Sequence, residues 1–282
     1  MYSREEDIKI TVERKVGDET YVAEADLVCS EGFIEPHFFA GFSGSRKSIL
    51  PGVASRTTVL ANHCSEFIAS PYSRTGILEG NPIHRDMVWA ARKAGLAFIC
   101  NVVINSEKEP IYAVAGDAEK AHEEGCRFLS SICRVKAKKA DIVISTNGGY
   151  PLDQNIYQAV KGMTAAEATV KDGGVIIMLA ASNDGLGGDD FYHQMADEKD
   201  IHKTMALFLS RGRNETVPDQ WQTQIFLRIL MKATVVYVSS APDEIVEDLH
   251  MIPAHSLEEA LEKARKIIGR ADATITAIPD GV

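Results

Sequence analysis

The chain has 282 residues, of which 45% are hydrophobic and 25% are charged, so its composition is that of an ordinary folded protein rather than a disordered one. This length predicts roughly two domains, with enough apolar side chains for a core that needs no disulfide or metal staple. The formal net charge of −10 argues against a general nucleic-acid or anionic-membrane surface, because such a surface needs a basic face.

The first half of the chain predicts strands, helices and one long loop. Residues 35–52, EPHFFAGFSGSRKSILPG, follow neither the helical nor the strand period, and their glycines and prolines predict a single shaped loop. Residues 96–104 are almost continuously apolar, which is typical of a strand buried on both faces. Patterning predicts further strands at 7–14, 26–34 and 111–116, and helices at 55–68, 82–94 and 117–132.

The second half predicts an α/β layer. A basic stretch, RVKAKK at 134–139, precedes it, and we place a domain boundary near residue 134, giving domains 1–133 and 134–282. Expected strands at 141–146, 173–180, 233–238 and 273–277 alternate with helices. This alternation favours a sheet of mostly parallel strands.

Several features predict a cytoplasmic protein. No apolar run approaches the ~18–20 residues that cross a bilayer, and the charged N-terminus, MYSREEDIKI, lacks the apolar stretch of a secretory signal. The cysteines are odd in number and form no CxxC pair, so we expect reduced and mostly buried thiols. They are Cys29, Cys64, Cys100, Cys126 and Cys133.

The 35–52 loop carries the first candidate chemistry, in His37, Lys47 and Ser48. Its order, Gly41-x-x-Gly44-x-x-Lys47-Ser48, matches the phosphate-binding P-loop poorly, because Arg46 stands where that pattern has a glycine. A lysine among glycines can instead act as a nucleophile toward a carbonyl or thiocarbonyl carbon. A solvated surface lysine is the alternative.

His63 lies one turn from Val59 and from Phe67 on the predicted 55–68 helix, at the border of its apolar stripe. It fits either a satisfied histidine at the edge of the core or a metal ligand. No HxxxH or CxxC partner is nearby, so a metal held by His63 needs its other ligands from distant segments or from a cofactor.

A third candidate region is NGGYPLDQNIYQAVKG, residues 147–162, which directly follows a predicted strand. Glycines at a strand's carboxyl end lie where α/β sheets bind ligands. On a helix from about residue 153, Tyr157, Gln158 and Lys161 fall opposite the apolar face. This polar face suits an anion or a nucleotide, or it is an ordinary solvated helix surface.

The 35–52 loop, the sequence ANHC at 61–64 and the segment 149–162 together resemble the lactate racemase family, whose enzymes carry a nickel-pincer nucleotide. The resemblance implies two α/β domains with the active site in the cleft between them. It implies that Lys47 is joined to the cofactor through a thioamide, that His63 ligates nickel, and that His37 is one of two acid-base histidines. It assigns Tyr157, Gln158 and Lys161 to the cofactor, and Tyr157, Lys161 and Trp221 to the substrate.

The implied reaction is racemisation or epimerisation of a 2-hydroxy acid, by proton abstraction and reversible hydride transfer to the cofactor. Family members carry a further segment before the equivalent of Asp7, which supplies the second catalytic histidine and contacts to the nucleotide phosphate and the substrate carboxylate. We therefore expect this chain to be the cofactor-anchoring portion of such an enzyme. Its first domain would be incomplete, and the chain would be inactive by itself.

Two expectations follow for partners. Apolar surface should be exposed on the strand at 26–34 or on its neighbours, where a partner supplying the missing half or a second copy would bind. Ser45 stands where the family pattern has a glycine, and Ala40 where it has a hydroxyl residue. The alternatives are a non-catalytic nucleotide- or partner-binding module, a paralogue with another substrate, or an enzyme that uses Lys47 for a Schiff base.

Overall fold

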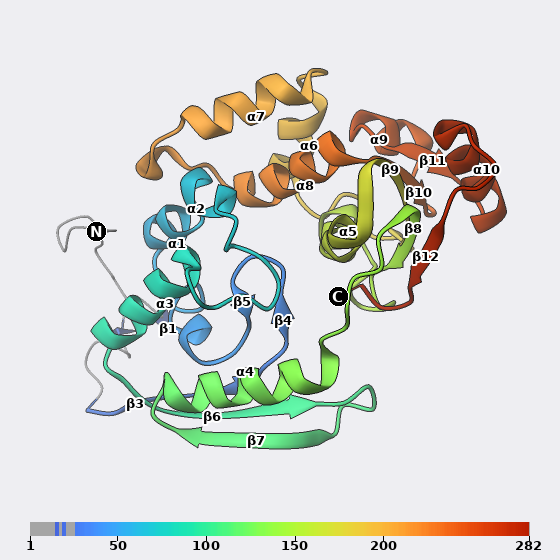
Figure 1. Cartoon of the computed structure of the whole chain (residues 1–282). Coiled ribbons are helices and arrows are strands. Elements are labelled where there is room, and N and C mark those ends of the chain that lie inside the picture. Colours follow the sequence, from blue (N-terminus) through green and yellow to red (C-terminus); the bar gives the residue numbers. More distant parts are fainter. Residues whose placement is uncertain (1–14, 17–18, 21–25, 282) are drawn as a thin grey trace. The chain divides into compact units, whose positions relative to one another are not determined.

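The computed structural model describes residues 15–16, 19–20 and 26–281, so the strand expected at 7–14 lies outside the described residues. Contacts divide the chain into two compact units (Figure 1). The first unit runs to Val135 and also includes Gly212–Thr216, and the second comprises Lys136–Arg211 and Val217–Val282. The sequence did not predict that the short segment at 212–216, far along the chain, packs with the first unit.

The first unit is built on a three-stranded sheet in the order β3-β6-β7. Strand β3 (Val28–Phe33) is parallel to β6 (Leu96–Ile104), and β6 is antiparallel to β7 (Pro110–Gly116). Helix α4 (Lys120–Cys133) packs along one face of this sheet, over a core that includes Ile99, Val103 and Leu129 (Figure 1). A separate two-stranded ribbon joins β1 (Lys15–Val16) to β2 (Glu19–Thr20).

The opposite face of the three-stranded sheet is exposed. Its large apolar side chains include Phe33, Phe98 and Ile111, each 44–45% exposed, and Leu27 at the start of the sheet is 66% exposed. The prediction that 96–104 is buried on both faces is therefore wrong, because α4 covers only one face and alternate residues point to the other. The expectation of exposed apolar surface on or beside 26–34 is confirmed.

The segment between β3 and β6 combines short elements. The expected loop contains β4 (Pro36–His37), β5 (Gly41–Phe42) and the 3-10 turn η1 (Ser45–Ser48). The single helix expected at 55–68 is instead α1 (Arg56–Asn62), capped by Ser55, and α2 (Ser65–Ala69). The break occurs because Cys64 has extended backbone angles and begins α2. Helix α3 (Pro82–Lys93) follows, capped by the side chain of Asn81.

The second unit is a parallel sheet between helical layers. Five strands lie in the order β11-β10-β9-β8-β12, and every pairing is parallel, as predicted. They are β8 (Ala140–Thr146), β9 (Val170–Leu179), β10 (Thr234–Val238), β12 (Ile275–Ile278) and β11 (Ile252–Ala254), which the sequence analysis missed. The observed architecture confirms the α/β class.

Helices cover both faces of this sheet. Helices α5 (Ile156–Thr169) and α8 (Gln220–Lys232) contact each other and the central strands, and α10 (Leu257–Ile268) packs over a core that includes Ile142, Val175 and Val236. The remaining helices of the second unit are α6 (Asp189–Ala196), α7 (Ile201–Ser210) and α9 (Asp243–Asp248), and the 3-10 turn η2 (Arg213–Glu215) belongs to the first unit.

The thiols are free, but their burial differs from the expectation. Cys64 and Cys126 are buried, whereas Cys29, Cys100 and Cys133 are exposed. The prediction of mostly buried cysteines is wrong because Cys29 and Cys100 belong to the sheet whose outer face is open, and Cys133 ends α4. Within the described part of the chain, no helix has the length and apolar character needed to cross a membrane.

Candidate functional site

Lys47 and His37 meet on the loop between β3 and α1. The Nζ atom of Lys47 lies 3.0 Å from Nε2 of His37. The backbone N–H of Ala40 donates to Nδ1 of His37 at 3.2 Å, which turns the Nε2 edge of the ring toward the amine. This contact places the amine of Lys47, a potential nucleophile, against one edge of an imidazole.

The path of this loop depends on a glycine and an asparagine. Gly41 has a φ of +82°, and a Cβ there would lie 2.3 Å from the carbonyl oxygen of Ile77, so only glycine permits the close approach. Asn81 donates from Nδ2 to the carbonyls of Phe39 and Ile77, at 2.8 and 3.0 Å. The start of α3 thus holds the loop between His37 and Lys47.

The side chain of Arg46 supports the same loop from inside. Its guanidinium is buried, and burial lowers its pKa to about 10, so it remains a cation. At 2.7–3.1 Å it donates to four carbonyl oxygens of the loop, those of Ala40, Phe42, Ser43 and Gly44. A single buried cation therefore fixes the backbone that carries both His37 and Lys47.

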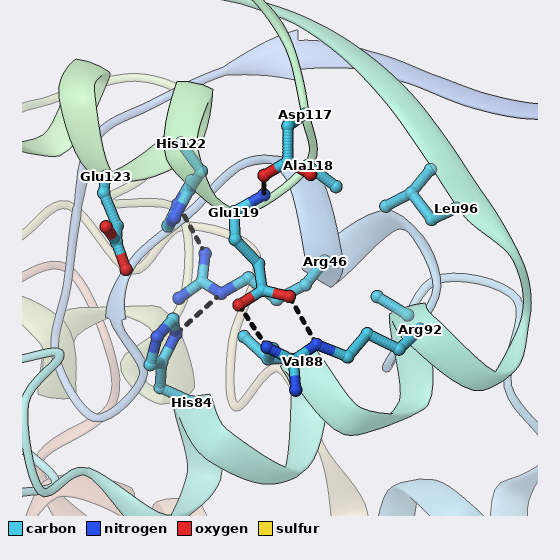
Figure 2. A pocket seen from close by; sticks show the side chains of 11 residues that line it. Arg46, His84, Val88, Arg92, Leu96, Asp117, Ala118, Glu119, His122 and Glu123 are labelled. Atoms are coloured by element: carbon cyan, nitrogen blue, oxygen red, sulfur yellow. Dashed lines mark hydrogen bonds and ion pairs between the residues drawn. The ribbon is translucent and has the colours of Figure 1, made fainter.

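Two histidines complete the surroundings of Arg46 (Figure 2). Its Nε donates to Nδ1 of His84 at 3.1 Å, and its Nη1 lies 2.8 Å from Nε2 of His122. Burial, and secondarily the charge of Arg46, lowers the pKa of both histidines to about 3, so both rings are neutral. A cavity of about 120 Å³ lies beside them, and an ion pair between Arg92 and Glu119 lines it.

His63 is a buried, neutral imidazole at the end of α1. Its Nδ1 lies 2.9 Å from the carbonyl oxygen of Val59, so Nδ1 carries the proton and Nε2 carries a lone pair. Burial, and secondarily the charge of Lys47, lowers the pKa of His63 to about 4. A neutral imidazole with its tautomer fixed in this way has the form of a metal ligand.

The ring of Phe39 brings these groups together. Its centroid lies 4.5 Å from the ring of His37 and 5.2 Å from the ring of His63, and Nζ of Lys47 lies 5.9 Å from it. The structure thus assembles His37, Lys47 and His63 around one side chain. Among the described residues, no three His, Cys, Asp or Glu side chains are grouped to hold a metal. The other ligands of a metal at His63 would therefore come from a cofactor or from groups outside this set.

The second unit carries the other sequence candidates on α5 and α8. Asn155 caps α5, and Tyr157, Gln158 and Lys161 are each half-buried rather than fully solvated. Tyr157 packs edge-on against Phe191 at 5.5 Å. Among the described residues, Oε1 of Gln158 is buried without a hydrogen-bond partner, a property of a group that awaits a ligand.

Two groups of the second unit act on the phenol of Tyr157: the indole of Trp221 and the carboxylate of Asp219. Burial, followed by the negative charge of Asp219, raises the pKa of Tyr157, so the phenol stays neutral. Sequence reasoning had selected Tyr157 and Trp221 and had missed Asp219, which stands two residues before Trp221 in PDQWQ.

The missed residues left few signals in the sequence. Arg46 stood out only as the residue that breaks the P-loop pattern, and nothing pointed to His84 or His122, which are 38 and 76 positions away from Arg46. The one sequence signal was an arginine inside an apolar, glycine-rich loop. If such an arginine is buried, its N–H groups need hydrogen-bond acceptors from the surrounding residues.

Comparison with known proteins decides the family. Residues 135–282 match the family model for the lactate racemase C-terminal domain, and residues 10–76 match that for the lactate racemase N-terminal domain. This chain belongs to the lactate racemase family. It is 60% identical over 260 residues to a lactate racemase of Thermoanaerobacterium thermosaccharolyticum, and 57% identical over 261 residues to one of Lactiplantibacillus plantarum. In each case the match spans 92% of this chain and 61% of the racemase.

Solved structures agree with this assignment. The lactate racemase apoprotein of Thermoanaerobacterium thermosaccharolyticum superposes with a TM-score of 0.91 at 60% identity, over 93% of this chain and 63% of that one. A protein from Thermotoga maritima, at 19% identity and a TM-score of 0.64, shares the fold. The chain therefore spans about three fifths of the length of these curated lactate racemases.

Proposed function

We propose that this chain is the cofactor-anchoring portion of a racemase or epimerase of 2-hydroxy acids that uses a nickel-pincer nucleotide. The observation that carries the proposal is the grouping of His37, Lys47 and His63 around Phe39 in a member of the lactate racemase family. The grouping offers a nucleophilic amine, a proton-transfer group and a neutral nitrogen ligand within one loop region.

The residues present fit the cofactor. Lys47 would hold it covalently through Nζ, which lies 3.0 Å from Nε2 of His37. His63 would ligate nickel through Nε2, because its Nδ1 is committed to the carbonyl of Val59. When bound, the cofactor supplies the capacity to accept a hydride from the substrate's alpha carbon and to return it.

The chain's own residues would move the proton and hold the substrate. His37 would exchange a proton with the substrate's hydroxyl group, as a general base and acid. The ammonium of Lys161 suits a carboxylate or phosphate, and the buried amide of Gln158 suits a further polar group of the cofactor. Tyr157 and Trp221, whose indole acts on the phenol, would line the substrate.

Mass spectrometry tests the attachment directly. The protein would be purified from a host that makes the cofactor, and its intact mass and nickel content would be measured. We expect an adduct that peptide mapping locates at Lys47 and that is absent from Lys47→Ala. The matched control, Lys93→Ala, removes another lysine of the first unit, on α3, and should keep the adduct. An unmodified Lys47 in protein from such a host would contradict the proposal.

Nickel content tests His63 separately. We expect His63→Ala to lose nickel while keeping the mass adduct, and the exposed His202→Ala to keep both. If His63→Ala kept both the adduct and its nickel content, His63 would not be a nickel ligand. A reducible imine at Lys47 in place of the adduct would favour a Schiff-base enzyme, and a bound nucleotide with no covalent link would favour a non-catalytic binding module.

We further propose that activity requires another polypeptide segment, packed on the exposed face of the β3-β6-β7 sheet. The face is apolar, and the curated relatives contain about two fifths more of their own length than this chain matches. That segment would bring the second acid-base group, so the chain by itself should not racemise a 2-hydroxy acid. We also place the protein in the cytoplasm, in agreement with its free thiols.

Thiol labelling tests this docking. Cys29 and Cys100 belong to the open sheet, and Cys133 at the end of α4 serves as an internal control. Adding the unmatched segment of a curated relative as a separate polypeptide should slow labelling of Cys29 and Cys100, leave Cys133 unchanged and allow turnover. Protection that instead increases with the concentration of the chain alone, together with a dimeric mass in solution, would identify a second copy as the occupant.

A further inference from the structure

Two consecutive glycines bring three separate segments of the second unit together. Gly187 has a φ of +83°, and a Cβ there would lie 2.4 Å from Oδ1 of Asn155 and 2.9 Å from Cβ of Tyr157. A Cβ on Gly188 would lie 3.0 Å from Oδ2 of Asp219 and 3.7 Å from Cδ2 of Tyr157. The carboxylate of Asp219 and the ring of Tyr157 are therefore both within 4 Å of one point beside the backbone of Gly188.

The conformation of Asp219 is unusual for its position. It precedes α8 as the cap residue, where an aspartate ordinarily accepts a backbone N–H of the first turn, yet its side chain makes no such bond. Its φ of +59° is in the left-handed region, which is sparsely populated by residues other than glycine. A residue that gives up its cap bond and adopts this backbone has its side chain directed elsewhere.

The carboxylate of Asp219 lies beside the ring of Tyr157, since both groups approach the same point at Gly188. Burial, followed by the negative charge of Asp219, raises the pKa of the Tyr157 phenol, and the indole of Trp221 lowers it, as a donor near the phenol oxygen does. Gln222, on the next position of α8, donates from its side chain to the backbone carbonyl of Tyr157. The beginning of α8 therefore holds the first turn of α5 at both its backbone and its side chain.

We propose that Asp219 is a positioning residue that fixes the direction of the Tyr157 hydroxyl proton, with Trp221 as the second bond of the same oxygen. This inference rests on the proposed role of Tyr157 in binding the substrate. A phenol that rotated freely would present either its proton or its lone pairs to a ligand. With the proton committed to Asp219 and the indole N–H donated, the hydroxyl has a single orientation before a ligand arrives, which reduces the cost of ordering on binding.

The pair of tryptophans provides a readout that needs neither cofactor nor turnover. The chain contains two tryptophans, so a ¹⁵N-labelled sample gives two indole N–H resonances, and Trp89→Phe assigns them. We expect the Trp221 indole proton to resonate downfield, as hydrogen-bonded protons do. It should move upfield in Tyr157→Phe, which removes the acceptor, while the Trp89 resonance stays in place.

A double-mutant cycle separates positioning from a general structural effect. Asp219→Ala should move the Trp221 resonance when Tyr157 is present and cause no further movement in the Tyr157→Phe background. The matched control is Asp190→Ala, on α6, whose charge acts on Asp219 but which makes no hydrogen bond with the phenol. We expect Asp190→Ala to move the Trp221 indole resonance by only a small fraction of the change that Asp219→Ala causes.

Two outcomes would overturn the inference. One is a Trp221 resonance that Asp219→Ala leaves in place, and the other is an equal shift in both backgrounds, which would mean that Asp219 acts without the phenol. If Asp219→Ala does not fold, Asp219→Asn, which preserves the side-chain shape, replaces it in the same double-mutant cycle. We then expect a smaller change in the Trp221 indole chemical shift. Failure of the adduct at Lys47 would overturn the proposed function and leave this cycle unaffected, so the two results are distinguishable.

Discussion

The first unit should be unusually sensitive to mild acid, because it holds three neutral histidines, of which His63 and His122 are buried and His84 is half-buried. Burial lowers the pKa of His63 to about 4, and of His84 and His122 to about 3, with the charges of Lys47 and Arg46 as the second cause. The unfolded chain takes up these protons near the ordinary histidine value of ~6.5. At pH values between the folded-state pKa values and ~6.5, the folded state therefore binds fewer protons than the unfolded state.

The sign and size of the effect follow from proton linkage. This contribution to stability is fully present above pH ~6.5 and is lost as the pH falls toward the folded pKa values. Between about pH 7.5 and about pH 5 each histidine costs about 2 kcal/mol, at ~1.4 kcal/mol for each pH unit below ~6.5. The three together cost about 6 kcal/mol, which is comparable with the ~5–15 kcal/mol that stabilises a whole domain. The raised pKa of the half-buried Asp86 carboxyl acts in the opposite direction.

Each unit contains one tryptophan, which makes the measurement selective. Trp89 lies on α3 of the first unit and Trp221 on α8 of the second. Urea unfolding of Trp221→Phe therefore reports the first unit, and unfolding of Trp89→Phe reports the second. We expect the midpoint of the first unit to fall steeply between the two pH values and that of the second to change less.

Substitution of single histidines checks the assignment. His122→Gln should remove about one third of the pH dependence of the first unit, since it removes one of the three histidine titrations, each worth about 2 kcal/mol. His202→Asn, at an exposed site on α7, should leave that dependence unchanged. A midpoint of the first unit that is the same at both pH values would refute the reasoning, because the unfolded chain must take up the protons.

Three substitutions test other parts of the structure by thermal unfolding. Arg46→Met should lower the free energy of unfolding by about 3–5 kcal/mol, because it leaves buried acceptors unpaired. Arg46→Lys should lower it less, since lysine keeps the charge and loses only the planar guanidinium. Equal effects of the two substitutions would mean that the planar guanidinium does not matter. Asp141→Asn should lower the midpoint of the second unit more than the exposed Asp272→Asn, because the Asp141 carboxylate accepts from the backbone and hydroxyl of Thr274 and pairs with Lys171 and Arg270. Gly162→Ala should destabilise the same unit by about 1–3 kcal/mol through overpacking, because its Cβ would lie 2.5 Å from the carbonyl oxygen of Thr146; a neutral effect would contradict that contact.

Local patterns in the sequence determined much of the second unit. Its apolar strand segments are continuous because helices cover both faces of the sheet, and continuous runs are what such strands require. The helical period of α5 predicts an apolar face opposite Tyr157, Gln158 and Lys161, and the apolar residues of that face, from Ile156 to Ala166, are buried. The short strand β11 escaped because three residues provide too little pattern.

The candidate site was partly determined by sequence as well. Glycines and prolines marked the 35–52 loop as shaped, and the residue types within it selected His37 and Lys47. That these two side chains meet at 3.0 Å, and that Phe39 lies between them and His63, depended on the folded loop. The break after α1, which turns His63 away from a continuous helix, was also invisible in a periodic pattern.

Tertiary structure alone decided the features that depend on distant partners. A continuous apolar run does not say whether one or both faces of a strand are covered, so the open face of β6 appeared only when its neighbours were in place. Arg46 acquires its role from His84 and His122, and Asp219 from a phenol 62 positions earlier in the sequence. Sequence periodicity reports the local environment along one element, whereas hydrogen bonds and burial of this kind arise between elements that only folding brings into contact.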